Sequence, residues 1–423
     1  MQRATSVADV HAAAGQLRDA EKRPGPAPEA LFEVLEAWSA AIAASPARDV
    51  PGVPFLKLWL RRATFEGMLC RELGPEFLRG DWTGERARLK DFPVGIVGHW
   101  PAANIEIQPL LSMVCAQLGG NVSLVRVPSD LVNATERLAQ ALAASDESGV
   151  LRDRVRFVSF PSERQDLHVA MAERVDGAMI WGGRESVMNV RSLPFPPWAR
   201  IASFGPRISV AMLDSASWSD PEERATWCQR LARDTWQFEQ QACSSPQALF
   251  IEKSRDCDPA ALVEALSGAF REENRLHPRQ AIAPSLASAI VRARASWLLD
   301  DVAHSAQFDP DPDWTILFGR STEVPEPTQG RTLPVLEVDD LLEPLARFDG
   351  QVQTLGLGMV DRGLEERIAE EAGRRGVDRI VKLGRMHVFE SPWDGQQLVA
   401  PMTRRVRHQV VAGGDSAEES IDG

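Results

Sequence analysis

The sequence contains no tyrosine, although it has 12 tryptophans and 16 phenylalanines. A tyrosine hydroxyl therefore cannot serve as the catalytic acid of any reaction that this chain performs. Cysteine is also scarce: there are five in 423 residues, an odd number without the paired spacing of a metal site. A long chain with so little cysteine is typical of a reducing compartment, so we expect a cytoplasmic protein without a metal.

Basic residues are in deficit, and long apolar runs are absent. The chain has 47 lysines and arginines and 60 aspartates and glutamates, which gives a formal net charge of −13. Because such a chain is a poor general binder of nucleic acid, we expect no nucleic-acid partner. No run approaches the roughly 18–20 apolar residues that span a bilayer. Residues 1–20 carry charges where a signal peptide has its apolar core.

Apolar segments of two kinds alternate along the chain and predict an α/β fold with a mostly parallel, doubly wound sheet. In the first half we expect strands at 93–98, 122–127, 155–158, 176–181 and twice within 200–213, and helices at 28–45, 54–79, 105–118 and 131–144. In the second half we expect strands at 248–252, 313–318, 332–337 and 351–356, and helices at 220–241, 259–271, 284–300, 339–347 and 363–375.

One cysteine lies in a context that suits chemistry. Cys243 belongs to the segment Gln240-Gln241-Ala242-Cys243-Ser244-Ser245-Pro246-Gln247, a polar loop between a predicted helix and a predicted strand. Such a loop exposes a nucleophile and leaves backbone N–H groups available for an oxyanion. The alternative is a buried structural thiol, which is how we interpret Cys70, Cys115 and Cys228. His168 and His387 lie in apolar contexts and are expected to be structural.

Five motifs in a fixed order resemble the aldehyde dehydrogenase superfamily: Pro93–Val97 with Trp100–Asn104, Gly120–Arg126 with Pro128-Ser129-Asp130, Trp181-Gly182-Gly183, Phe204–Ser209, and Gln240–Cys243. Within that superfamily the chain is most similar to the LuxC-type acyl-CoA reductases. Two further motifs support this similarity, Gly384-Arg385-Met386 and Trp393-Asp394-Gly395. The resemblance covers about residues 65–405. For Trp393-Asp394-Gly395 the residues themselves indicate only a turn.

The resemblance implies roles for particular residues. Cys243 would be the nucleophile, and the Asn104 amide would stabilise the oxyanion, although a turn-forming asparagine is the alternative. The residues implied in binding a nicotinamide cofactor are Arg126, Ser129, Asp130, Trp181, Gly182, Gly183 and Gly205. Arg126 would favour the 2′-phosphate of NADPH, whereas Asp130 would favour the 2′-hydroxyl of NADH. The family favours NADPH, with NADH as the alternative.

The sequence departs from the superfamily at the residue that activates water. Hydrolytic aldehyde dehydrogenases have a glutamate where this chain has Ser203. Without a base there, water attacks an acyl-cysteine slowly, which a thioester reductase requires. The alternative is that another carboxylate, such as Glu239, does this work. A second departure is that Arg126 precedes Pro128 by two residues, where the superfamily's lysine directly precedes its proline.

These observations predict an aldehyde-dehydrogenase-like protein of two lobes with the active site between them. The lobes are N-terminal helices with a Rossmann-like cofactor domain at 1–209 and a catalytic domain at 210–385, followed by a segment packing back at 386–412 and a disordered acidic tail at 413–423. The expected reaction is NAD(P)H-dependent reduction of an acyl thioester to an aldehyde. The acyl donor would be acyl-CoA, an acyl carrier or an acyl-synthetase partner, and self-association is expected from the fold. The alternatives are a non-redox acyl-transfer subunit and a non-catalytic interaction protein.

Overall fold

The computed structural model describes residues 1–85, 87–279, 281–299 and 303–410. These residues form two compact units. The first comprises Met1–Phe204 and the described residues from Gln396 onward, and the second comprises Gly205–Gly395. The predicted boundary after residue 209 falls inside a strand, and the predicted segment 386–412 is divided between the units at Gln396. The predicted acidic tail, 413–423, lies outside the described residues.

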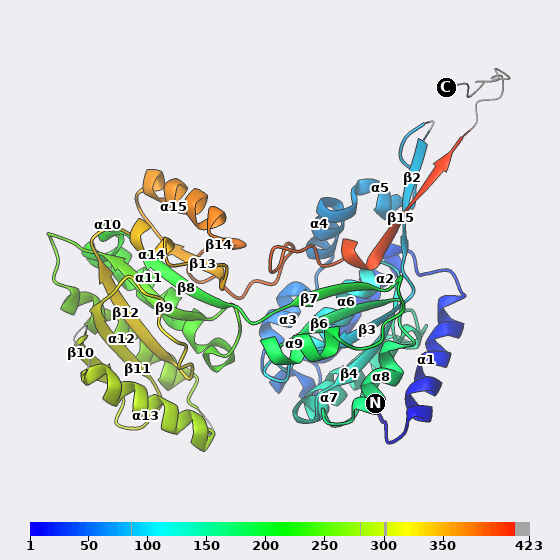
Figure 1. The fold of residues 1–423 in the computed structure, drawn as a ribbon, viewed down its shortest axis with the longest axis horizontal. Helices are drawn as coiled ribbons and strands as arrows, with labels where there is room; N and C mark the ends of the chain where they lie inside the picture. The colour runs from blue at the N-terminus through cyan, green and yellow to red at the C-terminus, as the bar shows by residue number, and fades with distance from the viewer. Residues whose placement is uncertain (86, 280, 300–302, 411–423) are drawn as a thin grey trace. The chain divides into compact units, whose positions relative to one another are not determined.

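The first unit contains a parallel sheet of six strands (Figure 1). Their order is β1-β5-β4-β3-β6-β7, and every neighbouring pair is parallel. Since the chain runs from β3 outward to β5 on one side and then from β6 to β7 on the other, the order reverses between β3 and β6. The strands span Gln2–Arg3 (β1), Ile96–Trp100 (β3), Val122–Val127 (β4), Val155–Ser159 (β5), Gly177–Trp181 (β6) and Arg200–Phe204 (β7).

Helices cover both faces of this sheet. On one face, α1 (Val7–Glu21) and α8 (Gln165–Ala172) contribute to an apolar core with the strands. Ser6 and Asp9 cap α1 reciprocally, which fixes its first turn. On the other face the strands meet α6, where the His99 ring contacts the Ser112 hydroxyl at 2.7 Å. The remaining helices are α2 (Pro28–Ala43), α3 (Val53–Trp59), α4 (Arg62–Leu73), α5 (Pro75–Arg79), α6 (Gln108–Leu118), α7 (Val132–Ser145) and α9 (Arg184–Arg191).

The segment predicted as one strand at 93–98 is divided between two elements. Strand β2 (Ala87–Pro93) pairs antiparallel with β15 (Thr403–Gln409) and forms an arm (Figure 1). Strand β3 begins at Ile96. The break occurs because Gly95 adopts a φ of 133° and Asn121 Oδ1 accepts hydrogen bonds from the amides of Val94 and Gly95. The chain therefore leaves the arm and enters the sheet at Gly95.

The second unit contains a sheet of seven strands in the order β10-β11-β12-β9-β8-β13-β14. Only β10 is antiparallel to its neighbour. Apolar cores lie on both faces, one beneath α11 and α12 and one beneath α14 and α15. The strands span Ile208–Leu213 (β8), Pro246–Glu252 (β9), Ala303–Phe308 (β10), Thr315–Arg320 (β11), Thr332–Val338 (β12), Val352–Gly358 (β13) and Arg379–Lys382 (β14). The helices span Ser215–Ser219 (α10), Pro221–Trp236 (α11), Pro259–Leu276 (α12), Pro284–Leu298 (α13), Leu342–Leu345 (α14) and Arg362–Arg374 (α15).

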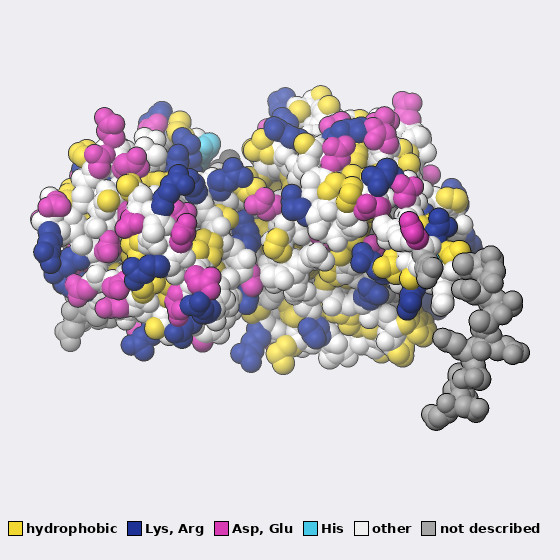
Figure 2. All heavy atoms as spheres, turned by 90° about the horizontal axis from the view of Figure 1, so that it is seen from above, with side chains coloured by type: hydrophobic (Ala, Val, Ile, Leu, Met, Phe, Trp, Pro, Cys, Tyr) yellow, Lys and Arg dark blue, Asp and Glu magenta, His cyan; other side chains and the backbone are white. Residues whose placement is uncertain are grey.

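The predicted α/β class with mainly parallel sheets is confirmed, and most predicted elements are present within a few residues. Two predicted helices are too long, because α11 stops at Trp236 and α14 covers only Leu342–Leu345. The segment 54–79, expected to form one or two helices, forms three, α3, α4 and α5. No helix in the described part of the chain is long and apolar enough to cross a membrane. Figure 2 shows basic and acidic side chains intermixed over the visible face of each unit, so the negative charge on that face is spread out.

Candidate active site

The loop that carries Cys243 begins with an unusual turn. After α11, the residues Phe238, Glu239 and Gln240 adopt φ values of 54°, 54° and 60°. Three consecutive non-glycine residues in the left-handed region are costly, so their side chains or backbone must be held by other parts of the fold. This turn ends the predicted helix 220–241 early and delivers the chain to Cys243.

Glu239 anchors the turn through two buried arginines. Its carboxylate accepts a hydrogen bond from Arg279 Nε at 2.9 Å and pairs with the Arg331 guanidinium. The side chains of Arg279 and Arg331 are only 4% and 3% exposed. A carboxylate that pairs with two buried cations has a structural role, because its oxygens already accept hydrogen bonds from them. The alternative prediction, that Glu239 activates water, is therefore poorly supported by its surroundings.

Cys243 is half-buried, and its carbonyl accepts a hydrogen bond from Ser209 Oγ at 2.6 Å. Burial, with a smaller contribution from the Asp394 carboxylate, raises the pKa of the Cys243 thiol to about 12. The Arg379 guanidinium and the Ser244 backbone amide act in the opposite direction. The thiol is therefore protonated at neutral pH, so the nucleophile needs a proton acceptor.

His387 does not supply that acceptor. Its Nε2 lies 2.7 Å from the Asp234 carbonyl, which can only accept, so Nε2 carries the proton. Its Nδ1 then accepts from the Ser244 hydroxyl at 2.9 Å. Burial lowers the pKa of His387 to about 4, so the ring is neutral. His387 thus holds Ser244, the residue after Cys243, and its predicted structural role is confirmed by these contacts.

The predicted oxyanion residue belongs to the first unit. Asn104 lies in the bend that follows β3 and is exposed. The bend is held by a hydrogen bond from the Ala102 amide to Gln108 Oε1 at 2.8 Å. Because this bend is at the carboxyl end of β3, it lies beside the point where the strand order reverses, which is where ligands bind in open α/β sheets.

Three predicted cofactor residues lie at an open helix end. Trp181 ends β6, stacks on Phe204 with ring centroids 3.7 Å apart, and donates from Nε1 to Ser112 Oγ at 2.8 Å. Gly182 and Gly183 then lead into α9, whose N-terminus receives no side-chain cap. A Cβ at Gly183 would meet no atom within 4 Å. The backbone at this helix start is therefore open to a phosphate group.

Three more predicted cofactor residues lie near the end of β4 and in the turn after it. Arg126 donates to the Phe160 carbonyl at 3.3 Å and lies over the Phe160 ring, while its buried Nε has no hydrogen-bond partner among the described residues. Burial lowers the pKa of Arg126. Ser129 and Asp130 are exposed in the 3-10 turn after the strand. These positions lie at the carboxyl edge of the sheet, as the bend after β3 and the end of β6 do.

The last two sequence positions of interest flank the division between the units. Gly205, the final predicted cofactor residue, begins the second unit, and a Cβ there would meet nothing within 4 Å. Ser203 lies in β7, where its hydroxyl accepts a hydrogen bond from Arg191 at 3.4 Å. Ser203 thus presents a hydroxyl that faces the Arg191 guanidinium.

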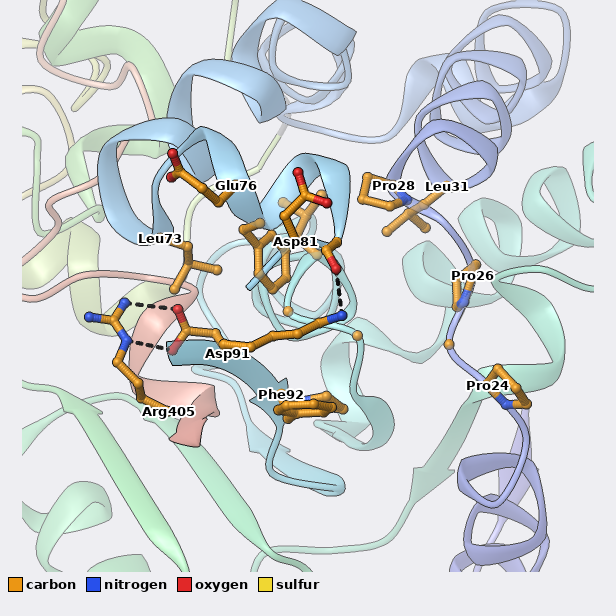
Figure 3. Close-up of a pocket in the computed structure, with 18 of the residues that line it drawn as sticks. Pro24, Pro26, Pro28, Leu31, Leu73, Glu76, Asp81, Asp91, Phe92 and Arg405 are labelled. Atoms are coloured by element: carbon orange, nitrogen blue, oxygen red, sulfur yellow. Dashed lines mark hydrogen bonds and ion pairs between the residues drawn. The ribbon is translucent and has the colours of Figure 1, made fainter. Parts of the chain in front are cut away.

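A cavity of about 570 Å³ lies within the first unit, but it is not the candidate site (Figure 3). It is lined by α5, the start of α2 and the arm, where Asp91 pairs with Arg405 at 2.8 Å. None of the predicted site residues lines it. In the described part of the chain, no group of three or more histidine, cysteine or acidic residues could hold a metal ion.

Comparison with known proteins identifies the family. The family model described as acyl-CoA reductase (LuxC) matches residues 31–405. The chain belongs to the LuxC family of acyl-CoA reductases. No curated protein shows significant sequence similarity to it. The match begins earlier than residue 65, the expected start of the resemblance, and it includes most of α2 and all of α3.

Solved structures confirm an aldehyde-dehydrogenase-like fold for this LuxC chain. The putative aldehyde dehydrogenase PutA from Anabaena variabilis superposes with a TM-score of 0.69 at 16% identity, covering 99% of this chain and 96% of that one. An aldehyde dehydrogenase from Brucella melitensis biovar abortus 2308 gives 0.70 at 13%, covering 95% and 89%. A bifunctional proline utilization A protein gives 0.72 at 16%, and this chain spans 96% of its own length but only 45% of that protein.

Asp394 is the group that sequence reasoning missed. The Trp393-Asp394-Gly395 motif helped to recognise the LuxC family, but locally it indicated only a turn. The structure gives Asp394 an electrostatic effect on the Cys243 thiol. No local pattern could have shown this, because the two residues belong to distant parts of the sequence.

Proposed function

We propose that this chain reduces an acyl thioester to an aldehyde with NADPH, or with NADH, through a covalent acyl-Cys243 intermediate. The single observation that carries the proposal is the position of Cys243. It is a half-buried cysteine of a LuxC-family chain, in a loop held by a strained turn and by Ser209 and Ser244. The acyl donor is acyl-CoA or an acyl group presented by a carrier or synthetase protein.

In the first half-reaction, the Cys243 sulfur attacks the thioester carbonyl and its thiol loses a proton. The carbonyl oxygen gains negative charge, which the Asn104 amide and the Cys243 backbone N–H are proposed to stabilise. One such donor contributes about 3–4 kcal/mol to the transition state. The bond to the donor sulfur then breaks, the donor leaves as a thiol that has taken up a proton, and the acyl group remains on Cys243.

The first unit has features that fit a dinucleotide. The uncapped start of α9 with open space at Gly183 suits a pyrophosphate, and Arg126 retains a buried N–H without a partner. Arg126 suits a 2′-phosphate, and exposed Asp130 suits a free 2′-hydroxyl, so both cofactors belong in the assay. When bound, the reduced nicotinamide supplies the hydride that converts the acyl group to an aldehyde.

Hydrolysis of the acyl-cysteine requires a carboxylate base, and neither candidate position supplies one. At the position where hydrolytic relatives have a glutamate, Ser203 presents a hydroxyl that accepts from Arg191. Glu239, the alternative base, is paired with Arg279 and Arg331. With neither carboxylate available, hydrolysis of the thioester is slow, and the acyl group survives until it is reduced.

The test is a spectrophotometric assay of NADPH and NADH consumption against a series of acyl-CoAs, with chromatographic detection of the aldehyde. We expect consumption equal to aldehyde formed, and none with Cys243→Ala. Acylation of Cys243 without any consumption of either cofactor would favour the non-redox acyl-transfer alternative. A wild-type protein that neither acylates nor consumes cofactor would contradict the proposal altogether.

A further inference from the structure

The cavity in Figure 3 has apolar walls that come from separate parts of the first unit. Its volume of about 570 Å³ is within the range of small-molecule sites. Side chains from α2, α4, α5, α6 and the arm line it, among them Leu31, Leu73, Phe77, Phe92 and Leu118. Protein interiors are normally close-packed, so a molecule that fills this cavity must itself have an apolar body.

Each acidic side chain that lines the cavity has an arginine partner. Asp91 accepts two hydrogen bonds from Arg405, at 3.0 and 2.8 Å, and Figure 3 shows the two side chains facing each other. Arg79 donates to the Asp81 carboxylate at 2.8 Å and lies 3.5 Å from the Glu76 carboxylate. The negative charges at the cavity are therefore matched within the chain, and a cation would have to compete with these arginines.

Lys90 is the charged group at the cavity that lacks a partner of opposite charge. It comes from β2, is half-buried, and forms no ion pair in the described part of the chain. Its ammonium has three N–H donors, and the structure gives it one acceptor, the Gly80 carbonyl at 2.5 Å. Since Gly80 also lines the cavity, the ammonium is held at the cavity wall with donors available for an anion.

We propose that this cavity binds an amphipathic carboxylate, with its anionic head on Lys90 and its apolar chain against the walls. Lys90 and Phe92 are two residues apart on β2, so they face the same side of the strand. The Lys90 Nζ atom lies 5.7 Å from the Phe92 ring centroid. One strand thus presents a cation and an apolar ring to the same molecule. The site lies in the first unit and does not depend on the reaction proposed for Cys243.

Three probes with the same apolar chain separate the contribution of the head from that of the chain. Decanoate carries a carboxylate, decanol a neutral hydroxyl and decylamine a cation. If Lys90 recognises the head, decanoate binds most tightly, decanol binds through its chain alone, and the ammonium disfavours decylamine. A cavity that bound apolar chains without regard to charge would not rank the three in this order, and one dominated by its carboxylates would favour decylamine.

The experiment is isothermal titration calorimetry of the full chain with each probe, below the concentration at which the probe forms micelles. It compares the wild-type protein with Lys90→Gln and with the control Lys57→Gln, an exposed lysine of α3 that does not line the cavity. We expect Lys90→Gln to weaken decanoate about 10-fold, as the loss of one charged hydrogen bond does, and to change decanol less than about 2-fold. Lys57→Gln should match the wild type with all three probes.

Leu89→Trp tests the apolar part of the site. Leu89 is half-buried and lines the cavity, so a larger ring at this position takes up space that the chain needs. We expect the affinities for decanoate and decanol to fall together in this variant. Added sodium chloride tests the head: it should weaken decanoate in the wild-type protein and change it little in Lys90→Gln, because salt screens the charge of Lys90.

Several outcomes would overturn the proposal: no binding of decanoate, decanoate no tighter than decylamine, an equal loss in Lys57→Gln and Lys90→Gln, or an unchanged affinity in Leu89→Trp. Titration of Cys243→Ala separates this cavity from the proposed acyl site, since unchanged affinity for decanoate supports the cavity and lost affinity contradicts it. Circular dichroism checks that each variant is folded. If Lys90→Gln does not fold, Lys90→Arg decides with the salt series: retained, salt-sensitive affinity supports the proposal, and salt-insensitive affinity overturns it.

Discussion

The Gln240 side chain binds both backbone groups of Thr332. Its Nε2 donates to the Thr332 carbonyl at 2.9 Å, and its Oε1 accepts from the Thr332 amide at 2.8 Å. The same Nε2 donates to the Pro246 carbonyl at 2.8 Å. Gln240 is fully buried, so these bonds have no competition from water. The cysteine loop is therefore attached to the first residue of β12, a strand distant in the sequence.

Gln240→Ala should destabilise the second unit. The substitution leaves buried backbone groups of Pro246 and Thr332 without partners, and each such group costs about 1–3 kcal/mol. With three such groups we expect a loss of at least about 3 kcal/mol, measured as a lower urea midpoint. Gln165→Ala, at an exposed glutamine at the start of α8, is the control and should leave the midpoint unchanged. Equal midpoints for the two variants would mean that the loop is held by other contacts.

Glu239→Gln should affect stability and leave the lifetime of the acyl-enzyme unchanged. Removing the carboxylate leaves the buried charges of Arg279 and Arg331 without their anion. Because Glu239 itself is 37% exposed, we expect a loss below the roughly 3–5 kcal/mol of a fully buried pair. Thermal unfolding measures the first effect, and intact mass after addition of acyl-CoA measures the second. A markedly longer-lived acyl-enzyme in this variant would show that Glu239 does activate water.

Cys243→Ala should abolish reductase activity while binding of NADPH survives, because the covalent step is lost and the cofactor residues are untouched. Titration of NADPH fluorescence and the aldehyde assay measure the two properties. The matched control is Cys115→Ala, since Cys115 is fully buried in α6 and burial raises the pKa of its thiol. Activity that falls as far in the control would mean that the two thiols have been assigned the wrong roles.

Asn104→Ala should lower kcat by about 10²–10³-fold if the amide stabilises the oxyanion. Affinity for the cofactor should change little, because the interaction forms only as charge develops on the carbonyl oxygen. Steady-state kinetics with fluorescence titration of NADPH separates the two quantities. An unchanged kcat would leave Asn104 as a residue of the bend after β3 alone.

Acyl-CoA added without reduced cofactor should produce a long-lived acyl-Cys243, since no carboxylate stands at Ser203 to activate water. Intact mass spectrometry should show the added acyl mass, and NADPH should then release it as aldehyde. Ser203→Glu should shorten the lifetime by releasing free acid, and Ser203→Ala is the uncharged control. Rapid turnover of acyl-CoA to free acid by the wild-type protein would reveal a general base elsewhere and contradict the reductase proposal.

The sequence by itself determined the elements that depend on local chemistry. The strand at Val122–Val127 was predicted with its observed bounds because an apolar run lies between Gly120-Asn121 and Pro128. The loop around Cys243 was recognised because small polar residues separate a helix from a strand. Motifs in a fixed order then pointed to the LuxC family and to an aldehyde-dehydrogenase-like fold.

Only the tertiary structure decided how the nucleophile is held and which groups set its proton affinity. Non-glycine residues rarely enter the left-handed region, so nothing local predicts the turn at 238–240. It forms because Glu239 and Gln240 meet Arg279, Arg331 and Thr332, which only the folded sheet brings near. The effect of Asp394 on Cys243 has the same origin. Electrostatic coupling depends on distance in space and on exclusion of water, and a local sequence pattern reveals neither.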